Sequence, residues 1–271
     1  MSIKSYLYAR RPELAVASEF YGSYRNLRKA GFKKTPYGFL MAGIPSMQDG
    51  SYEADEVGHF IEHLRKADVL IDVGANVGYF SLIARSLNKK VVAVEPLWNN
   101  LQFIYHNLSV NDWLDVEVFP VGLADRPGVS VLYGVGTAAS FIKDWAGIST
   151  KKRMVPVTTL DILTSGRFIG QELLIKIDVE GLEYSVLKGA ASTLARKPAP
   201  VWIVESGLTG HFPGGVNENF SQLFELFRSH GYTARGLEAD TGEPITEAQV
   251  KSWVENLNAD GQYNFLFKKP D

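Results

Sequence analysis

The chain of 271 residues contains no cysteine. It therefore has no disulfide framework, no thiolate nucleophile and no cysteine-ligated metal site. It also lacks an excess of charge of one sign, since 28 basic and 30 acidic residues give a net charge of −2. A protein balanced in this way has no global field that would recruit nucleic acid or anionic lipid. We therefore expect no nucleic acid and no membrane surface among its partners.

Long apolar segments and targeting signals are missing as well. The apolar runs are far shorter than the roughly 20 residues that a membrane-spanning helix needs. Arg10 and Arg11 lie near the N-terminus, but no apolar segment of a signal peptide follows them. Together with the absence of cysteine, these features are typical of a soluble protein of the reducing cytoplasm. The 45% of apolar residues is ample for one large core.

From residue 68 onward the hydrophobic pattern alternates between short buried runs and amphipathic segments. We expect strands at residues 69–71, 91–94, 116–121, 173–177 and 201–204, and helices at 80–87, 97–111, 183–195 and 220–230, the last being the final long helix. Residues 129–133 predict one strand of an inserted hairpin, and residues 134–152 a mobile loop. Residues 232–237 and 263–267 predict a closing antiparallel pair. Strands that alternate with helices indicate a mostly parallel sheet covered on both faces.

The N-terminal region has a different pattern. Residues 13–30 predict a helix that ends at Gly31, and residues 32–51 are rich in glycine and proline and predict a loop or short irregular strands. Residues 51–66 predict a second helix, with Val57, Phe60, Ile61 and Leu64 on one face. We therefore divide the chain into a helical N-terminal cap at 1–66 and a main domain at 67–271.

The most informative segment runs from Asp72 to Phe80 and reads Asp-Val-Gly-Ala-Asn-Val-Gly-Tyr-Phe. It follows a buried strand and opens a helix, and its glycines allow a tight turn and a close approach of a ligand. The next strand ends at Glu95, where a carboxylate can accept hydrogen bonds from both hydroxyls of a ribose. These features predict a site for an adenosine-containing cofactor. Asn76 departs from the Gly-x-Gly-x-x-Gly fingerprint of dinucleotide sites, which favours S-adenosylmethionine over NAD and leaves an NAD-dependent oxidoreductase as the alternative.

Four strings occur in order along the chain: Ile71–Gly78, Val94–Pro96, Val157–Asp161 and Lys176–Glu183. Together they resemble the FkbM family of class I S-adenosylmethionine-dependent methyltransferases, over about residues 68–205. The resemblance implies an α/β fold of the Rossmann-like, doubly wound type, with a mostly parallel seven-stranded sheet. It also implies O-methylation of a small-molecule or glycan acceptor, on a hydroxyl of a saccharide or a secondary metabolite.

The resemblance also assigns residues to the cofactor. Asp72, Gly74, Asn76 and Gly78 would hold the methionyl end, with Asp72 accepting from the ammonium directly or through water. Glu95, followed by Pro96, would bind the ribose, and Gly122 and Leu123 would flank the adenine. Asp178 would lie near the sulfonium, and the cap would bring Tyr52 and Glu53 over the cofactor.

A sugar hydroxyl is a poor nucleophile at neutral pH, so we expect a general base. The candidates are Asp178, Glu180 and His211, in no order, with Lys176 beside them to hold a carboxylate ionised. Glu180 has helix capping as an alternative role, and His211 has that of a solvated surface residue. Asp178 and Glu205 end neighbouring strands and could together bind Mg²⁺ or Ca²⁺, although no residue is assigned to a metal.

Two further expectations concern the acceptor and the class of protein. Trp145 lies in the predicted loop and is a candidate platform for stacking a sugar ring. A non-catalytic protein that binds a ligand through an inherited nucleotide pocket stays open as an alternative to an enzyme.

Overall fold

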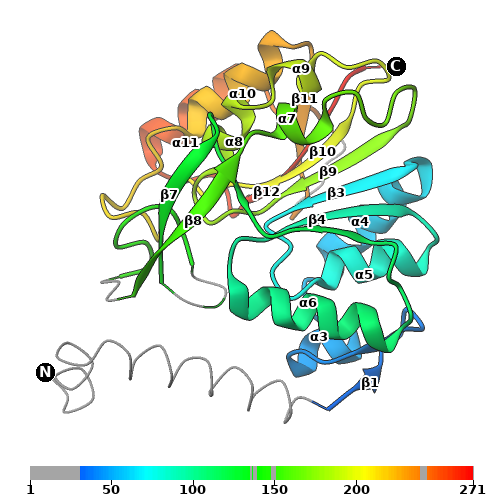
Figure 1. Cartoon of the computed structure of the whole chain (residues 1–271). Coiled ribbons are helices and arrows are strands. Elements are labelled where there is room, and N and C mark those ends of the chain that lie inside the picture. The colour runs from blue at the N-terminus through cyan, green and yellow to red at the C-terminus, as the bar shows by residue number, and fades with distance from the viewer. Residues whose placement is uncertain (1–30, 135, 137–138, 148–150, 239–242, 271) are drawn as a thin grey trace, which may run out of the picture.

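The computed structural model describes residues 31–134, 136, 139–147, 151–238 and 243–270. The predicted helix at 13–30 lies outside these residues. The centre of the fold is a seven-stranded sheet of order β11-β12-β10-β9-β3-β4-β5 (Figure 1). Its strands are β3 (Val69–Val73), β4 (Lys90–Val94), β5 (Glu117–Phe119), β9 (Leu173–Ile177), β10 (Val201–Glu205), β11 (Thr233–Gly236) and β12 (Asn264–Lys268).

Five neighbouring strands, from β10 to β5, are parallel, whereas β12 is antiparallel to both β10 and β11. The predicted mostly parallel, doubly wound sheet is confirmed, and so is the antiparallel closing pair. The strand order runs outward from β3 in both directions, toward β4 and β5 on one side and toward β9 and β10 on the other. In an open α/β sheet, such a reversal point leaves a crevice beyond the carboxyl ends of the strands, where ligands bind.

Helices cover both faces of the sheet (Figure 1). One face carries α4 (Ala54–Lys66), α5 (Tyr79–Ser86) and α6 (Trp98–Val110). The other face carries α7 (Leu160–Thr164), α8 (Glu183–Lys188), α9 (Ala191–Leu194), α10 (Phe220–Ser229) and α11 (Glu247–Asn256).

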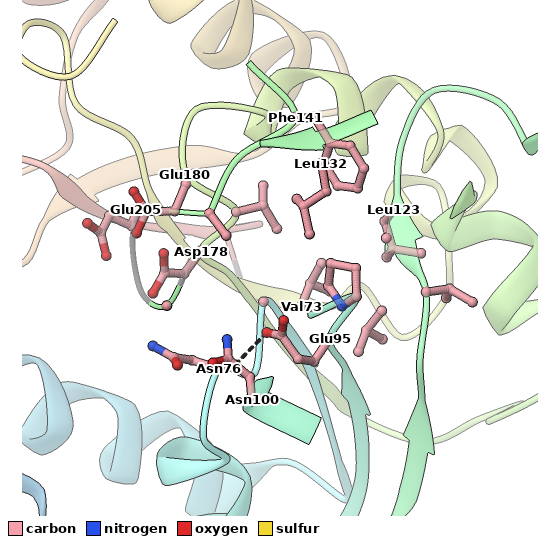
Figure 2. Close-up of a pocket in the computed structure, with 18 of the residues that line it drawn as sticks. Val73, Asn76, Glu95, Asn100, Leu123, Leu132, Phe141, Asp178, Glu180 and Glu205 are labelled. Carbon is pink, nitrogen blue, oxygen red and sulfur yellow. Dashed lines mark hydrogen bonds between the residues drawn. The ribbon is translucent and has the colours of Figure 1, made fainter. Parts of the chain in front are cut away.

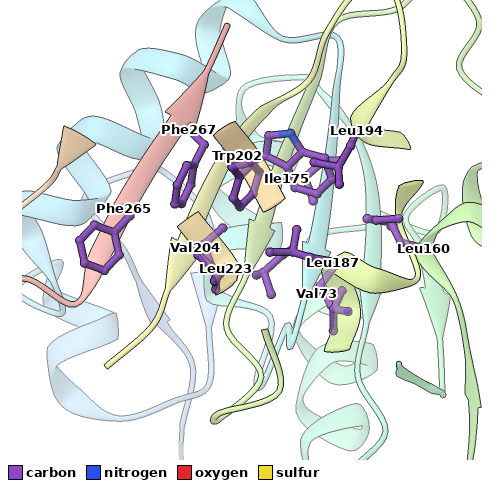
Figure 3. Packing of buried hydrophobic residues seen from close by; sticks show 14 of the residues in the cluster. Val73, Leu160, Ile175, Leu187, Leu194, Trp202, Val204, Leu223, Phe265 and Phe267 are labelled. Carbon is purple, nitrogen blue, oxygen red and sulfur yellow. The ribbon is translucent and has the colours of Figure 1, made fainter. Parts of the chain in front are cut away.

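Successive side chains of β3 go to opposite faces, as the pleat of a strand requires. Val69, Ile71 and Val73 belong to the core beneath α8, α10 and α11, whereas Leu70 belongs to the core beneath α4, α5 and α6. The first of these cores contains Trp202, Phe265 and Phe267, which pack beside Ile175 and Leu187 of the parallel strands and their helices (Figure 3).

The second predicted helix of the cap is confirmed as α4, and it packs into the main core. Val57, Phe60 and Leu64 are buried in the same cluster as residues of α5 and α6, with Ile61 packed against it. Before α4, the chain forms β1 (Lys33–Lys34), β2 (Leu40–Met41) and α3 (Pro45–Asp49). The division of the chain at residue 66 stays a prediction.

A small sheet of order β6-β8-β7 stands apart from the main one. It consists of β6 (Gly122–Leu123), β7 (Gly128–Tyr133) and β8 (Lys152–Thr158), with β7 and β8 antiparallel. The predicted inserted hairpin is therefore confirmed. Leu132 and Val155 of this hairpin pack with Leu97 in a small separate cluster, with Phe141 against it.

Two sequence expectations were wrong in detail, and one strand was not predicted. The helix expected at 183–195 is broken into α8 and α9 at Gly189, the C-cap of α8. A Cβ at position 189 would lie 2.3 Å from the backbone oxygen of Ala124, so only glycine fits there. The helix at 220–230 is not the final long one, since α11 follows it and begins with a capping box of Thr246 and Gln249. The strand that was not predicted is β8, which follows the loop expected at 134–152; its Val155 and Val157 are buried, and its Pro156 is exposed.

Candidate functional site

A pocket with a volume of about 200 Å³ lies beyond the carboxyl ends of β3, β4, β9 and β10. It occupies the reversal point of the strand order, where the topology predicts a ligand. The residues that line it are Tyr52, Glu53, Val73, Gly74, Asn76, Val94, Glu95, Pro96, Asn100, Val121, Gly122, Leu123, Leu132, Gly136, Ala139, Phe141, Asp178, Val179, Glu180 and Glu205.

Most of the site residues expected from the sequence lie in this wall. They are Tyr52, Glu53, Gly74, Asn76, Glu95, Pro96, Gly122, Leu123, Asp178, Glu180 and Glu205. Four expected residues do not line the pocket: Asp72, Gly78, Lys176 and His211.

The glycine-rich turn is fixed by its packing against the next strand. Gly74 has a φ of +86°, and a Cβ added to it would lie 1.7 Å from the backbone oxygen of Asp178. The backbone N–H groups of Gly74 and Ala75 donate to the oxygen of Val94, at 2.9 and 3.1 Å. Only glycine fits at position 74, because any side chain would push β9 away from β3. Gly78, with a φ of +90°, begins α5 behind this turn.

Glu95 binds the turn to the start of the next helix. Its Oε2 accepts from the N–H of Asn76 at 2.9 Å (Figure 2), and its Oε1 accepts from the N–H of Leu97 at 2.7 Å. Burial raises the pKa of Glu95 to about 8, against the lowering effect of these hydrogen bonds. Each carboxylate oxygen can accept more than one hydrogen bond, so Glu95 can still receive ligand hydroxyls.

Asp72 lies behind the pocket wall rather than in it. Its Oδ2 accepts a hydrogen bond of 2.6 Å from the hydroxyl of Ser81 in α5, and the residue is 2% exposed. Burial raises its pKa to about 6. Through this hydrogen bond with Ser81, Asp72 orients the first turns of α5.

One side of the pocket is apolar. Val94, Val121, Leu123, Leu132 and Phe141 form it, and Figure 2 shows the last three across the pocket from the carboxylates. Gly122 allows Phe141 to close this side, since a Cβ at position 122 would lie 2.5 Å from the ring. Such a slot is suited to a flat, apolar ring system.

Leu132, Phe141 and Asn100 line the pocket but were not expected from the sequence. Leu132 lies in β7, and Phe141 lies between β7 and β8; we call this part of the chain, residues 128–158, the inserted segment. Asn100 lies in the first turns of α6. The only available signal was the alternating pattern of residues 129–133, which predicts a strand but not what the strand faces.

The opposite side of the pocket carries the carboxylates of Asp178, Glu180 and Glu205 (Figure 2), with Glu53 nearby in the wall. Burial raises the pKa of Glu205 to about 9, and the negative charge of Asp178 adds to this shift. Burial, again with Asp178, raises the pKa of Glu180 to about 7. The expected approach of Asp178 and Glu205 is therefore present. Among the described residues, no group of three or more His, Cys, Asp or Glu is arranged to hold a metal ion.

Three of the lining residues that are not glycine have left-handed backbone conformations. The φ angles are 45° for Glu53, 51° for Asn76 and 54° for Glu180. Such conformations cost free energy and are concentrated at functional sites, where the surrounding structure holds them in place.

Lys176 lies beneath the acidic side and is 1% exposed. Its Nζ is 3.2 Å from Asp178 Oδ2 and 3.3 Å from Glu56 Oε1, and 4.4 Å from the centre of the Phe80 ring. Burial favours the neutral amine, but Asp178 and Glu56 outweigh it and raise the pKa of Lys176 well above its usual value. Lys176 is therefore a charged group that positions Asp178 from behind the wall.

Glu180 is held by the inserted segment. The indole Nε1 of Trp145 donates to Glu180 Oε2 at 2.8 Å, and the hydroxyl of Ser140 donates to the backbone oxygen of Glu180 at 2.7 Å. Trp145 does not line the pocket, so the structure places it as a partner of Glu180 rather than as a platform at the cavity.

His211 contacts this region through Trp145 and Ala146. Its ring centre lies 5.6 Å from that of Trp145, and its backbone oxygen accepts from the N–H of Ala146. Because the imidazole is outside the pocket wall, the geometry favours Asp178 and Glu180 over His211 as bases.

The Tyr-x-x-x-Lys spacing that many nicotinamide-dependent enzymes use occurs once in the sequence, at Tyr184 and Lys188. Both residues are on α8, neither lines the pocket, and Lys188 pairs with Asp125 at 3.4 Å. The spacing therefore gives the oxidoreductase alternative no support.

No helix in the described part of the chain combines the length and apolar character needed to cross a membrane.

The family model for the methyltransferase FkbM domain matches residues 72–234. A search of curated proteins gave no match.

Solved structures with a similar arrangement include three methyltransferases. The precorrin-6y C5,15-methyltransferase of Geobacter metallireducens has 16% identity and a TM-score of 0.40, covering 68% of this chain and 74% of its own. The O-methyltransferase TomG of Streptomyces achromogenes, involved in tomaymycin synthesis and solved with S-adenosylmethionine, has 14% identity and a TM-score of 0.45, covering 83% and 82%. A methyltransferase of Agrobacterium tumefaciens has 11% identity and a TM-score of 0.43, covering 86% and 67%.

Proposed function

The chain belongs to the FkbM family of S-adenosylmethionine-dependent methyltransferases, and from this premise we propose that it methylates a hydroxyl oxygen of a saccharide or secondary metabolite. The observation that carries the proposal is the division of the pocket. Glu95, the glycine-rich turn and an apolar slot lie on one side, and a row of carboxylates lies on the other. The first side suits a nucleoside, and the second suits an acceptor that must lose a proton.

The cofactor fits the residues of the first side. The apolar slot of Leu123, Leu132 and Phe141 would hold the adenine, and Glu95 would accept from the ribose hydroxyls. Gly74 and Asn76 would approach the methionyl end. When bound, S-adenosylmethionine supplies a methyl group that is already activated by its positive sulfur, so the protein must mainly align the acceptor oxygen.

Glu180 is the favoured general base. A base works best when its pKa lies near the working pH, and the pKa of Glu180 is raised to about 7. Asp178 is already engaged by the ammonium group of Lys176 at 3.2 Å. We therefore assign proton removal to Glu180 and orientation of the acceptor hydroxyl to Asp178.

The proposal is tested by separate measurements of binding and turnover. Calorimetry with S-adenosylmethionine and with NAD⁺ should show binding of the first only. Glu95→Gln should weaken that binding about tenfold or more, because an amide NH₂ would face the N–H donors of Asn76 or Leu97. Formation of S-adenosylhomocysteine with a panel of sugar and phenolic hydroxyl acceptors then tests transfer. Binding without turnover, together with indifference to Asp178→Asn, would instead indicate the non-catalytic binding protein.

A further inference from the structure

The acceptor side of the pocket is rich in carboxyl groups and has no cationic side chain at its surface. Glu53, Asp178, Glu180 and Glu205 line it, and among the described residues no lysine, arginine or histidine does. These carboxylates come from three separate segments, at the start of α4 and at the ends of β9 and β10. The buried Lys176 lies behind the wall and is already shared between Asp178 and Glu56.

A second hollow of about 160 Å³ adjoins the pocket and shares Glu53 with it. Its wall contains Glu53, Ala54, Asp55, Glu56, Leu237, Glu238, Tyr263 and Asn264. Asn264 is paired in register with Glu205 on the neighbouring strand, so the hollow begins where the acceptor side ends. Glu238 is held there by the N–H of Asn264, which donates to its Oε1 at 2.8 Å.

Several buried oxygen atoms of this second hollow have no hydrogen-bond donor within the described part of the chain. They are Oδ1 of Asn264, Oε1 and Oε2 of Glu56 and Oε2 of Glu53. Asn264 is 3% exposed and Glu56 is 6% exposed, so both side chains are more than nine-tenths buried. Glu56 Oε1 lies near Lys176 Nζ but without the geometry of a hydrogen bond. Burying acceptors without donors is costly, which indicates that a ligand supplies the donors.

A partner that donates several hydrogen bonds would satisfy these oxygens, and a positive charge on it would favour the ionised form of the carboxyl groups beside them. An ammonium group has three donors and no acceptor, and its hydrogen bonds to carboxylates are charge-assisted. An anionic acceptor, such as a sugar phosphate, would meet like charge on this side. A divalent metal ion is a poorer fit, because the described acidic residues form no metal-binding cluster.

We propose that the methyl acceptor carries a protonated amine and that Glu53 and Glu205 bind it where the pocket meets the second hollow. This inference rests on the proposed function and narrows its acceptor to amine-bearing molecules, such as amino sugars or amine-containing metabolites. Asn264 and Glu56 supply further acceptors from the second hollow. The amine anchors the acceptor, and a hydroxyl elsewhere on the same molecule receives the methyl group.

Proton release should accompany this binding. Burial raises the pKa of Glu53 to about 7 and that of Glu205 to about 9, so both hold protons near neutral pH when no cation is bound. The charged and titratable groups that face them are Tyr52, Glu56, Asp178, Glu180, Lys176 and Tyr263. An ammonium ion favours the ionised carboxylates, so binding should release protons. For an alkyl amine that stays protonated, such as tyramine, binding should strengthen as the pH rises from 7 to 9, the range in which these two groups titrate.

The test is calorimetry on protein saturated with S-adenosylhomocysteine, with matched probes. One set is glucosamine, N-acetylglucosamine, glucose and glucose 6-phosphate, and another is tyramine and N-acetyltyramine. We expect at least one free amine to bind about tenfold tighter than its N-acetyl partner, with glucose 6-phosphate the weakest sugar. Glu205→Gln should remove most of this preference. Glu255→Gln, the same change at an exposed residue of α11 that lines neither the pocket nor the second hollow, should keep it.

The outcomes separate this inference from the proposed function. Equal affinity for amine and N-acetyl partners, a preference for the phosphate, or no binding of either amine up to about 10 mM would overturn the inference. Failure to bind S-adenosylmethionine, or to methylate any acceptor, would overturn the proposed function instead. A methyl group found on nitrogen would support amine recognition and would overturn the choice of a hydroxyl as target.

Discussion

The two sides of the pocket are built by different means. On the side assigned to the cofactor, Glu95 and the glycine-rich turn lie at the ends of β3 and β4 and are held by hydrogen bonds from main-chain N–H groups. Only the apolar slot of this side comes from β6 and the inserted hairpin. The acceptor side is assembled from the start of α4, the ends of β9 and β10 and the inserted segment, and charged side chains hold it. The first is a local structure, whereas the second depends on the whole fold.

This difference has consequences for robustness. On the cofactor side, a change at one backbone position alters the shape of the site directly, because the turn is in contact with β9. On the acceptor side, the carboxylates depend on distant partners, namely Lys176 beneath the wall and Trp145 above it. Substitutions at those partners should change charge and protonation while the cofactor site keeps its shape.

Gly74→Ala should have the largest effect. The added Cβ would meet the backbone oxygen of Asp178, and the φ of +86° is unfavourable for alanine, so we expect loss of cofactor binding and of methyl transfer. Calorimetry and S-adenosylhomocysteine formation measure both. Gly58→Ala, in the interior of α4 with open space around it, is the matched control and should be neutral or stabilising by up to about 1 kcal/mol. Normal cofactor binding by the position-74 variant would show that the turn is not the rigid element described above.

Lys176→Met should come next, as a loss of stability. It removes the cation between Glu56 and Asp178 and leaves buried charge without a partner, which costs about 3–5 kcal/mol. Urea unfolding measures the change. Lys188→Met removes a half-exposed ion pair with Asp125 and should cost about 1 kcal/mol or less. If the two variants were equally stable, the acceptor side would not depend on its buried cation.

The same contrast explains what the sequence could predict. Gly74, Asn76 and Glu95 were expected at one site and do line one pocket, because a strand, a turn and a following acid are local features. Gly122, expected from the family resemblance, lines the same pocket. Asp178 and Glu205 were also expected together, since parallel strands end at one edge of a sheet. In these cases, the secondary structure alone determines the position of the side chain.

Other residues have positions that depend on contacts between distant parts of the chain. Asp72, expected at the methionyl end of the cofactor, does not line the pocket and instead accepts from Ser81, whereas Lys176 lies beside Asp178 as expected but beneath the wall. The position of Phe141 and Leu132 in the pocket wall could not be predicted, since both belong to the inserted segment, which packs against the main domain. His211 contacts Trp145 rather than the cavity. Long-range packing decides such positions, and a single sequence does not encode it in any short motif.

Glu180→Gln should reduce turnover without disturbing the cofactor side. If Glu180 is the base, kcat should fall about 10²- to 10⁴-fold while the affinity for S-adenosylmethionine stays unchanged. Glu172→Gln, an exposed residue before the opposite end of β9, should leave both quantities as they are. A large loss in Asp178→Asn combined with near-normal turnover in Glu180→Gln would reverse the roles that we assign to the two carboxylates.

Trp145→Phe should have the smallest effect, a shift in pH dependence. The indole N–H lowers the pKa of Glu180 by favouring its ionised form, against the burial that raises it to about 7. Activity that needs ionised Glu180 should therefore rise with pH near 7, and loss of the N–H should move that rise to higher pH by about one unit. Phenylalanine can keep the edge contact that position 145 makes with Phe212.

The matched control for that shift lies on α11. Trp253 donates from its Nε1 to Asp260 at 2.8 Å, the same kind of bond as that of Trp145, but away from the pocket. Trp253→Phe should leave the pH profile of kcat/KM unchanged even if it lowers stability. Equal profiles for Trp145→Phe and the wild type would mean that Glu180 does not set the rise. The inserted segment would then close the acceptor side without controlling its protonation.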